Sequence, residues 1–556
     1  MFYRFTALFL MLLLIPGVSF SEDADRLEKR FESREPPKSG FGSALPPLKQ
    51  RAAAGRLRQS LALERVEIIG STVYADKDLE PILASYLNRP ASPELVEELT
   101  EEIAKKYEAD GYPYTQVSVE PPKTPTGAPR IVIREAYIDN VIIQGEFQDK
   151  KGRFASLAEK IKAVRPVYKP TLERYLLLAN DLAGIYKVEA SIEASEENPG
   201  AHTLTLQVTP MKTTSGFVYL DNRGTDAVGP STIVPGVFIS NPFGYFGKTS
   251  ILAATTAQPK ELRYLSVKYE LPVNEDGTIV QAKVSYNKSY PGNMEAIDFS
   301  SASSTLSLGV EHPFLRTQQK NFTGYGKFDV KYSNTRNDLN AGLLTNTTDE
   351  TRVFRVGGDF DYTDSTKAIT RLQVEWSHGL DAMGANSDNL TSDGVVDFDK
   401  VRYSLSRTQP LTILSPKLDK WTLYGAVEGQ ISSDPLLSAE ECGIGGADFG
   451  RAYDASEITG DRCIKASAEL GRSFDTSGID WLKSGSGYLF YDIGEVRERG
   501  IETPEQESIS SAGIGMEFQT SESVNFTVEL AKPLTKEVTN ENDKDLRVFG
   551  TVTILF

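Results

Sequence analysis

The sequence predicts two successive α+β units followed by an all-β domain, an antiparallel transmembrane β-barrel of about sixteen strands. Three observations lead to this fold class: an apolar leader, a β-α-α-β-β pattern that occurs twice, and polar–apolar alternation that continues to the last residue. The expected segments are a signal peptide at 1–21, a charged helix at 22–35, a proline-rich linker at 36–61, α+β units at 62–136 and 137–210, and the barrel at 211–556.

The composition narrows the classes of function. The 556 residues carry a formal charge of −17, from 60 basic and 77 acidic residues. A nucleic-acid partner would need a basic face to neutralise phosphates, so this balance predicts none. No Cys/His metal spacing, phosphate-binding loop or strand-elbow serine occurs, and Glu469, Asp480 and Asp492 are not spaced as an acid pair. The sequence therefore predicts a protein that is not an enzyme and uses no cofactor or metal.

The N-terminus predicts export from the cytoplasm. An apolar run from Phe5 to Pro16 follows Arg4 and precedes the small residues Gly17 and Ser19. This run is too short to cross a bilayer and suits a cleaved secretory signal peptide. No other run of eighteen apolar residues occurs, which excludes a helical membrane protein.

The next two segments carry charge and proline. Residues 22–35 mix acidic and basic side chains around Leu27 and Phe31, which indicates a solvated helix that ends at Pro36. Two apolar residues cannot bury such a helix in a core. It is either a frayed tail or a plug helix that sits in a polar lumen. Residues 36–61 indicate an extended tether.

The repeated unit is recognised by its second helix. In the first unit Ser92 can cap that helix, Pro93 suits its first turn, and Gly111 ends it. Gly145 and Gly184 occupy equivalent places in the second unit, after its first strand and its second helix. A small sheet backed by two helices leaves an exposed edge and groove, to which an extended peptide can add as a strand. The alternative is that the repeats are only structural spacers.

From Thr213 onward the apolar residues recur with a period of two. Leu265 and Val267 share one face of a strand, and Ser266 and Lys268 share the other. This pattern fits a soluble sandwich or a membrane barrel. Segments of about ten residues favour the barrel, because that length crosses a bilayer when the strand is tilted.

The connections and the aromatic residues also favour the barrel. Short connections such as 272–278 alternate with long ones such as 334–351 and 378–396, as turns and loops at opposite ends of a barrel would. Aromatic residues recur near strand ends, where interfacial girdles are expected. These aromatic residues are Tyr219, Phe243, Tyr245, Tyr290 and Phe314.

In this order the parts resemble the outer-membrane transporters of two-partner secretion. These are the haemolysin-activating and filamentous-haemagglutinin transporters, relatives of the BamA-like barrel assembly proteins. The resemblance covers essentially the whole mature chain and implies that the repeats are POTRA domains in the periplasm. Phe556, aligned with the apolar face of the last strand, resembles the signal by which such barrels are recognised for assembly.

Two short motifs carry the resemblance to specific residues. In this superfamily a loop that folds back into the lumen carries Val-Arg-Gly-Tyr/Phe, which Gly450-Arg451-Ala452-Tyr453 matches at the arginine and the aromatic. A Phe-x-Asp-x-Gly motif on the thirteenth strand matches fully at Phe490, Asp492 and Gly494. Because a guanidinium and a carboxylate can pair through two hydrogen bonds, Arg451 is expected to hold the loop on Asp492. The alternative is that Arg451 is a solvated loop charge.

Both cysteines flank the first motif. Cys442 and Cys463 are expected to form a disulfide around the loop tip, since exported proteins favour disulfides, with two free thiols as the alternative.

The resemblance also implies a function and its partners. The expected function is export of an unfolded secreted exoprotein through the barrel (type V secretion), by a monomer in the outer membrane. The expected contacts are the exoprotein, outer-membrane lipids and the barrel assembly machinery. A barrel-assembly factor and a diffusion porin are the alternatives, although a porin would not need the repeats. The sequence does not identify the exported partner, which could be an adhesin, a cytolysin, a haem-binding protein or a contact-dependent toxin.

Overall fold

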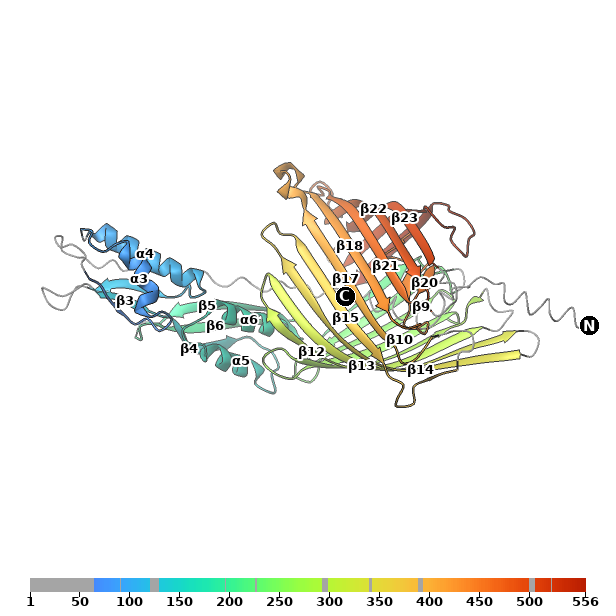
Figure 1. Ribbon diagram of the computed structural model, residues 1–556, viewed down its shortest axis with the longest axis horizontal. Coiled ribbons are helices and arrows are strands. Elements are labelled where there is room, and N and C mark those ends of the chain that lie inside the picture. Colours follow the sequence, from blue (N-terminus) through green and yellow to red (C-terminus); the bar gives the residue numbers. More distant parts are fainter. Residues whose placement is uncertain are drawn as a thin grey trace, which may run out of the picture.

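Two small α+β domains lie in a row beside one end of a closed β-barrel (Figure 1). The expected signal peptide, charged helix and linker (1–61) lie outside the residues that the structure describes. In this computed structural model the described residues are 65–90, 92–120, 130–195, 197–225, 228–292, 299–339, 343–388, 394–499, 506–521 and 523–556.

Both α+β domains have the predicted β-α-α-β-β order. The first contains β1 (Glu67–Ile69), α3 (Asp76–Ala84), α4 (Pro93–Ala109), β2 (Gln116–Glu120) and β3 (Arg130–Arg134). The second contains β4 (Tyr137–Gln144), α5 (Arg153–Lys162), α6 (Lys169–Asn180), β5 (Ile185–Ala194) and β6 (Ala201–Pro210). The sheets have the orders β1-β3-β2 and β4-β6-β5, so β2 and β5 are corresponding edge strands.

The repeat extends to two glycines that follow the first strand of each unit. Gly70 and Gly145 have φ angles of +90° and +130°, a backbone conformation that residues with a Cβ atom rarely adopt. A Cβ atom at Gly70 would lie 2.3 Å from the carbonyl oxygen of Ile133, and one at Gly145 would lie 2.2 Å from that of Val208. Each glycine thus lets the chain turn tightly against the last strand of its own sheet.

The barrel wall consists of sixteen long strands among the described residues. They are β7 (Thr214–Asp221), β8 (Thr232–Ser240), β9 (Lys248–Thr256), β10 (Leu262–Pro272), β11 (Ile279–Ser289), β12 (Ser300–Arg316), β13 (Lys320–Leu339), β14 (Leu343–Thr363), β15 (Ile369–Gly379), β17 (Asp399–Pro410), β18 (Trp421–Ser432), β21 (Arg462–Ser473), β22 (Ser484–Arg497), β23 (Gln506–Gln519), β24 (Val524–Pro533) and β25 (Arg547–Leu555). The short strand β16 (Asn386–Ser387) adds to β14, and the helices η2 (Leu411–Ile413) and η3 (Pro416–Leu418) connect β17 to β18. Pairing of β25 with β7 closes the barrel.

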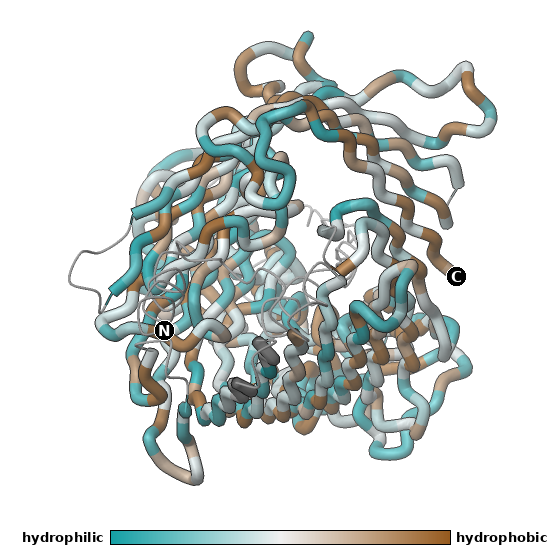
Figure 2. Tube along the Cα trace, turned by 90° about the vertical axis from the view of Figure 1, so that its right-hand side faces the viewer, coloured by the Kyte–Doolittle hydropathy of each residue, from teal (hydrophilic) through white to brown (hydrophobic). Residues whose placement is uncertain are grey.

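Alternation along the strands separates the two faces of the wall. Leu265 is 49% exposed on the outer face, whereas its neighbours Tyr264 and Ser266 are buried on the inner face. Hydrophobic and hydrophilic residues alternate along the strands when the barrel is viewed from the end opposite the α+β domains (Figure 2). The outer apolar face suits lipid, and the inner face is polar. No helix among the described residues is long and apolar enough to cross a membrane.

Two details of the expected barrel are wrong. Tyr219 is not in an outer girdle, because it faces the interior and packs in an apolar cluster with Phe217 and Val234. The described part of the range 334–351 is not a loop, because β13 continues to Leu339 and β14 begins at Leu343, and the two strands pair beyond the ends of their neighbours (Figure 1). Its sequence is polar on both faces, so the period of two is lost even though the strands pair. The turn at 272–278 and the long connection at 378–396 lie where they were expected.

The second α+β domain rests on the turns at the near end of the barrel. Arg153 donates from Nη2 to the carbonyl oxygen of Pro272 at 2.8 Å, and Arg174 donates from Nη2 to that of Pro313 at 2.8 Å. Arg316 forms a two-pronged pair with Asp181, at 2.7 and 2.9 Å. Three arginines therefore join the domain to two turns of the wall through directional bonds.

Asp276, in the turn between β10 and β11, adds a charged contact to this junction. Lys160 and Tyr175 donate to its carboxylate at 3.2 and 3.1 Å. Burial alone raises the pKa of Asp276, but these bonds and the charges of Lys160 and Arg174 hold that pKa below its usual value. The carboxylate therefore stays ionised in neutral solution and holds the domain in one orientation.

Candidate functional site

The long connection between β18 and β21, residues 433–461, turns back into the barrel. It carries a small hairpin of β19 (Cys442–Ile444) and β20 (Ile458–Gly460), in which Cys442 pairs with Gly460. Beyond this hairpin the tip, residues 445–457, buries Phe449, Ala452 and Tyr453 against the inner wall. In wall order it is the sixth connection on the side away from the α+β domains.

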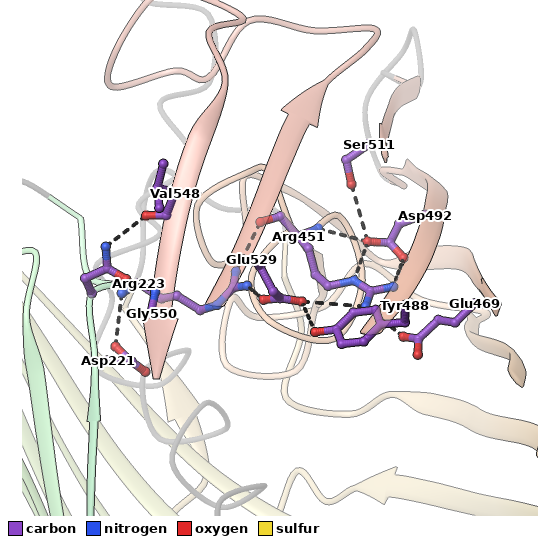
Figure 3. A network of polar contacts seen from close by, with 11 residues as sticks. Asp221, Arg223, Arg451, Glu469, Tyr488, Asp492, Ser511, Glu529, Val548 and Gly550 are labelled. Atoms are coloured by element: carbon purple, nitrogen blue, oxygen red, sulfur yellow. Dashed lines mark hydrogen bonds and ion pairs between the residues drawn. The ribbon is translucent and has the colours of Figure 1, made fainter. Parts of the chain in front are cut away.

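Arg451 holds this tip on the wall (Figure 3). Its guanidinium donates to Asp492 of β22 from Nε to Oδ2 at 3.0 Å and from Nη2 to Oδ1 at 2.8 Å. The backbone N–H of Arg451 also donates to Asp492 Oδ2 at 3.0 Å. Arg451 is 4% exposed and Asp492 is fully buried, so the pair is shielded from solvent. Breaking such a pair by removing one partner costs about 3–5 kcal/mol, because the other charge stays buried.

The three motif residues of β22, the thirteenth strand of the wall, have different contacts. The Arg451 guanidinium lies over the ring of Phe490 at 3.7 Å, a cation–π contact. Asp492 supplies the carboxylate. At Gly494 a Cβ atom would lie 2.7 Å from Ile444 of the hairpin, so glycine allows the hairpin to approach the wall. We assign three roles: the Phe490 ring supports the guanidinium, Asp492 pairs with its charge, and Gly494 leaves room for the loop hairpin.

The tip backbone accommodates the departures from the superfamily motif. Gly450 has φ +77°, so the left-handed position lies before the arginine. Ala452 is not among the described residues with positive φ, and its carbonyl oxygen accepts a hydrogen bond from Arg547 at 2.9 Å. The Tyr453 hydroxyl lies 3.2 and 3.1 Å from the carbonyl oxygens of Ser510 and Lys536. An alanine after the arginine is therefore compatible with this tip.

Further residues complete the network, and the sequence did not assign them to it. Arg451 Nη1 donates to Glu469 of β21 at 2.7 Å, and Nη2 donates to the Ser467 hydroxyl at 3.0 Å. Glu529 of β24 accepts from the Tyr488 hydroxyl at 2.7 Å and lies 3.8 Å from Arg451. The sequence signal that could have identified Glu469 and Glu529 is a carboxylate on the polar, inward-facing side of a predicted wall strand. From the sequence alone, Glu469 is a candidate only for a catalytic acid.

A second ion cluster holds the loop nearer its base. Glu440 pairs with Arg355 of β14 at 2.7 Å and with Lys400 of β17 at 2.5 Å. Arg355 also pairs with Asp329 of β13 at 2.7 Å. All four side chains are largely buried. The loop thus contacts the wall in two places, through Glu440 at β14 and β17 and through Arg451 at β21 and β22.

The two cysteines form a disulfide, Cys442–Cys463, with a Cα–Cα distance of 6.1 Å. Cys442 belongs to the loop hairpin and Cys463 to the wall strand β21, so the bond fixes the loop base to the wall. A polar cavity beside it, of about 100 Å³, is lined by Arg402, Glu428 and Lys465 among others. The described residues contain no group of His, Cys, Asp and Glu that could hold a metal ion.

Removing the disulfide is expected to lower the stability of the barrel. A closed loop of this length restricts the unfolded chain, so Cys442→Ser with Cys463→Ser should lower the free energy of unfolding by about 3 kcal/mol. The midpoint of heat-induced loss of the compact barrel on gel electrophoresis measures the change. The native protein should not react with a thiol label before reduction. Labelling without reductant would contradict the bond.

Comparisons with known proteins agree with this architecture. The family model "Haemolysin secretion/activation protein ShlB/FhaC/HecB" matches residues 200–518, more than half of the chain, and the "POTRA domain, ShlB-type" model matches residues 61–135. The chain is 21% identical over 499 residues to the heme/hemopexin transporter protein HuxB of Haemophilus influenzae, covering 83% of this chain and 81% of HuxB.

Solved structures show the same fold. CdiB from Escherichia coli aligns with a TM-score of 0.73 at 17% identity, covering 97% of this chain and 98% of CdiB. BamA from Haemophilus ducreyi lacking POTRA domains 1–3 aligns with a TM-score of 0.52 at 13% identity, covering 89% of this chain and all of that one. With the family-model matches, this architecture places the barrel in the outer membrane and the POTRA domains in the periplasm. The chain belongs to the ShlB/FhaC/HecB haemolysin secretion/activation family, the outer-membrane transporters of two-partner secretion.

Proposed function

We propose that this protein recognises an unfolded secreted partner through its POTRA domains and passes it through the barrel to the cell surface. The observation that carries this proposal is an edge strand, β5, that begins at the rim of the barrel. A Cβ atom at Gly184, just before β5, would lie 2.8 Å from Asn241 in the turn between β8 and β9. A segment added to β5 would therefore end beside the barrel entrance.

The free edge of β5 suits an extended peptide of variable sequence. β5 pairs with β6 on one side only among the described residues. The N–H of Val188 points away from β6 and donates to Asn180 Oδ1 at 3.0 Å, so by alternation the N–H groups of Ala190 and Ile192 point the same way. Backbone hydrogen bonds at such an edge give affinity without requiring a particular sequence.

The loop tip must shift for a chain to pass, because it lies inside the barrel. Its contacts are hydrogen bonds, ion pairs and apolar packing, all of which can break and reform, whereas its base is covalently attached. In this proposal the partner crosses in extended form, and its folding outside the cell makes the crossing directional. The partner is a secreted exoprotein of the two-partner class.

Co-expression with a candidate exoprotein tests the proposed function. The expected result is the exoprotein in the medium only when this protein is present, with normal amounts of other outer-membrane barrels after its deletion. A general loss of barrels on deletion would instead favour an assembly factor. Passage of small solutes without any exported protein would favour a diffusion porin.

Ala190→Pro tests the strand edge directly. Proline removes the outward N–H and is tolerated on an edge strand, so export should fall at least about fivefold while the POTRA domain stays folded. Ala190→Val, which keeps the N–H group, is the matched control. The amount of exoprotein in the medium is measured. Equal export by the two variants would exclude recognition at this edge.

A further inference from the structure

Arg223 lies just beyond the end of β7, where the barrel closes on itself, and reaches the network around Arg451 (Figure 3). The seam between β7 and β25 is short: Phe217–Asp221 pair with Leu555–Thr551. At the end of the seam where β7 begins, the backbones of Gly216 and Phe556 exchange two hydrogen bonds, at 2.8 and 2.9 Å. The paired part of the seam thus ends at Asp221, two residues before Arg223.

Asn222 extends the seam with its side chain. Its N–H donates to the carbonyl oxygen of Gly550 at 3.3 Å, and its Oδ1 accepts from the N–H of Gly550 at 2.7 Å. Its Nδ2 donates to the carbonyl oxygen of Val548 at 2.9 Å. At this last step of the seam the side-chain amide oxygen takes the place of the main-chain carbonyl as the acceptor for Gly550, directly before Arg223.

The Arg223 guanidinium then contacts three elements. Nη1 donates to the carbonyl oxygen of Arg451 at 3.1 Å, and Nη2 pairs with Glu529 of β24. Its carbon lies 4.0 Å from the centre of the Phe549 ring of β25. Arg223 is 7% exposed, so these contacts are made away from bulk water. A lysine has no planar fork and could not reach the tip carbonyl and Glu529 in the same geometry.

We propose that Arg223 is a positioning residue for the loop tip, which it holds across the seam of the barrel. The tip is then fixed on two sides: the Arg451 side chain binds β21 and β22, and the Arg451 carbonyl is bound from β7. Glu529 links the two arginines, since it pairs with Arg223 and lies 3.8 Å from Arg451. Release of the tip belongs to the proposed function, on which this role rests.

The test measures the tip itself and needs no exported partner. Ala452, which is fully buried beside Arg451, is replaced by cysteine as a reporter, and the native cysteines are already bonded. The labelling rate with a membrane-impermeant maleimide is measured on the purified barrel. Loss of a buried charge-assisted contact should raise this rate at least about tenfold in Arg223→Ala. Arg223→Lys should give an intermediate rate, and Arg371→Ala, in an exposed ion pair with Asp361, should leave it unchanged.

A cross-seam disulfide separates positioning of the tip from closure of the seam. Tyr219 and Thr553 are register partners without mutual main-chain hydrogen bonds, a spacing of about 4.5 Å that a disulfide can bridge. With both replaced by cysteine and oxidised, Arg223→Ala should still label rapidly at residue 452. A return to the wild-type rate would mean that Arg223 only closes the seam. An unchanged rate in the compact, uncrosslinked Arg223→Ala barrel would also overturn the proposal. A protein that exports nothing but shows the expected labelling would refute the proposed function alone.

Discussion

Arg451→Ala is expected to abolish export of the partner while the barrel still inserts into the outer membrane. The substitution removes every side-chain bond between the tip and Asp492, Glu469 and Ser467. It leaves Asp492 buried without its cation, which costs about 3–5 kcal/mol and displaces the tip. The wall strands keep their own pairing, so the compact barrel should still form. Exoprotein in the medium and heat-modifiable mobility of the barrel are the two measurements.

Arg451→Lys sharpens this expectation. Lysine keeps the charge but cannot form the two-pronged pair with Asp492 while bonding Glu469 and Ser467, so export should remain at least about tenfold below wild type. Arg472→Ala is the matched control, because Arg472 is on the same wall strand as Glu469 and lies exposed over Trp421. Normal export by Arg451→Ala would exclude the anchoring role.

Deletion of Phe556 is expected to reduce the barrel in the outer membrane more than tenfold. The residue contributes two backbone hydrogen bonds to Gly216 at the end of the seam. Its ring covers Gly216, where an added Cβ atom would lie 2.6 Å from the ring, and it is 63% exposed on the outer face. Loss of the residue removes an end of the closing strand and the terminal aromatic that we expect the assembly machinery to recognise.

Phe322→Ala provides the control for this second prediction, since Phe322 is another exposed aromatic on the outer face, away from the seam. Outer-membrane fractions are compared by immunoblot, together with the periplasmic fraction. Phe556→Ala, which keeps the backbone bonds, should show whether the ring or the strand end matters. Normal amounts of barrel after deletion of Phe556 would contradict both roles.

The sequence was sufficient for the architecture because its two periodicities are strong. Ser92, Pro93 and Gly111 delimit a helix by local chemistry, and the structure confirms each of these roles: the Ser92 side chain accepts from the Leu95 N–H at 3.2 Å. The alternation of Leu265 and Ser266 likewise reports a wall with one apolar face. Such signals act within one or two turns of the chain, so a single sequence carries them.

The remainder of the site depends on contacts that no local pattern records. Arg223 and Glu529 are 306 residues apart and meet only because the barrel closes. Tyr219 has the sequence position expected of a girdle aromatic, but its strand, in which it pairs with Val234, turns its side chain to the inside. The strand ends at 334–339 and 343–351 are mostly polar on both faces, so they hardly differ from a loop in hydropathy. Closure and register arise from pairing between separate segments, and a strand that is polar on both faces carries no alternation that would reveal it.

The disulfide leaves the loop tip on two short arms, and these limit how far the tip can move. Arg451 is nine residues from Cys442 and twelve residues from Cys463 of the wall, so the fully extended nine-residue arm would let it travel at most about 30 Å from Cys442. A tip on so short a tether stays at a high effective concentration near Asp492, on the order of millimolar. Re-closure is then an intramolecular step whose rate does not depend on the number of chains that have passed. In the proposed function, these two short arms return the tip to its site on the wall after each chain has passed.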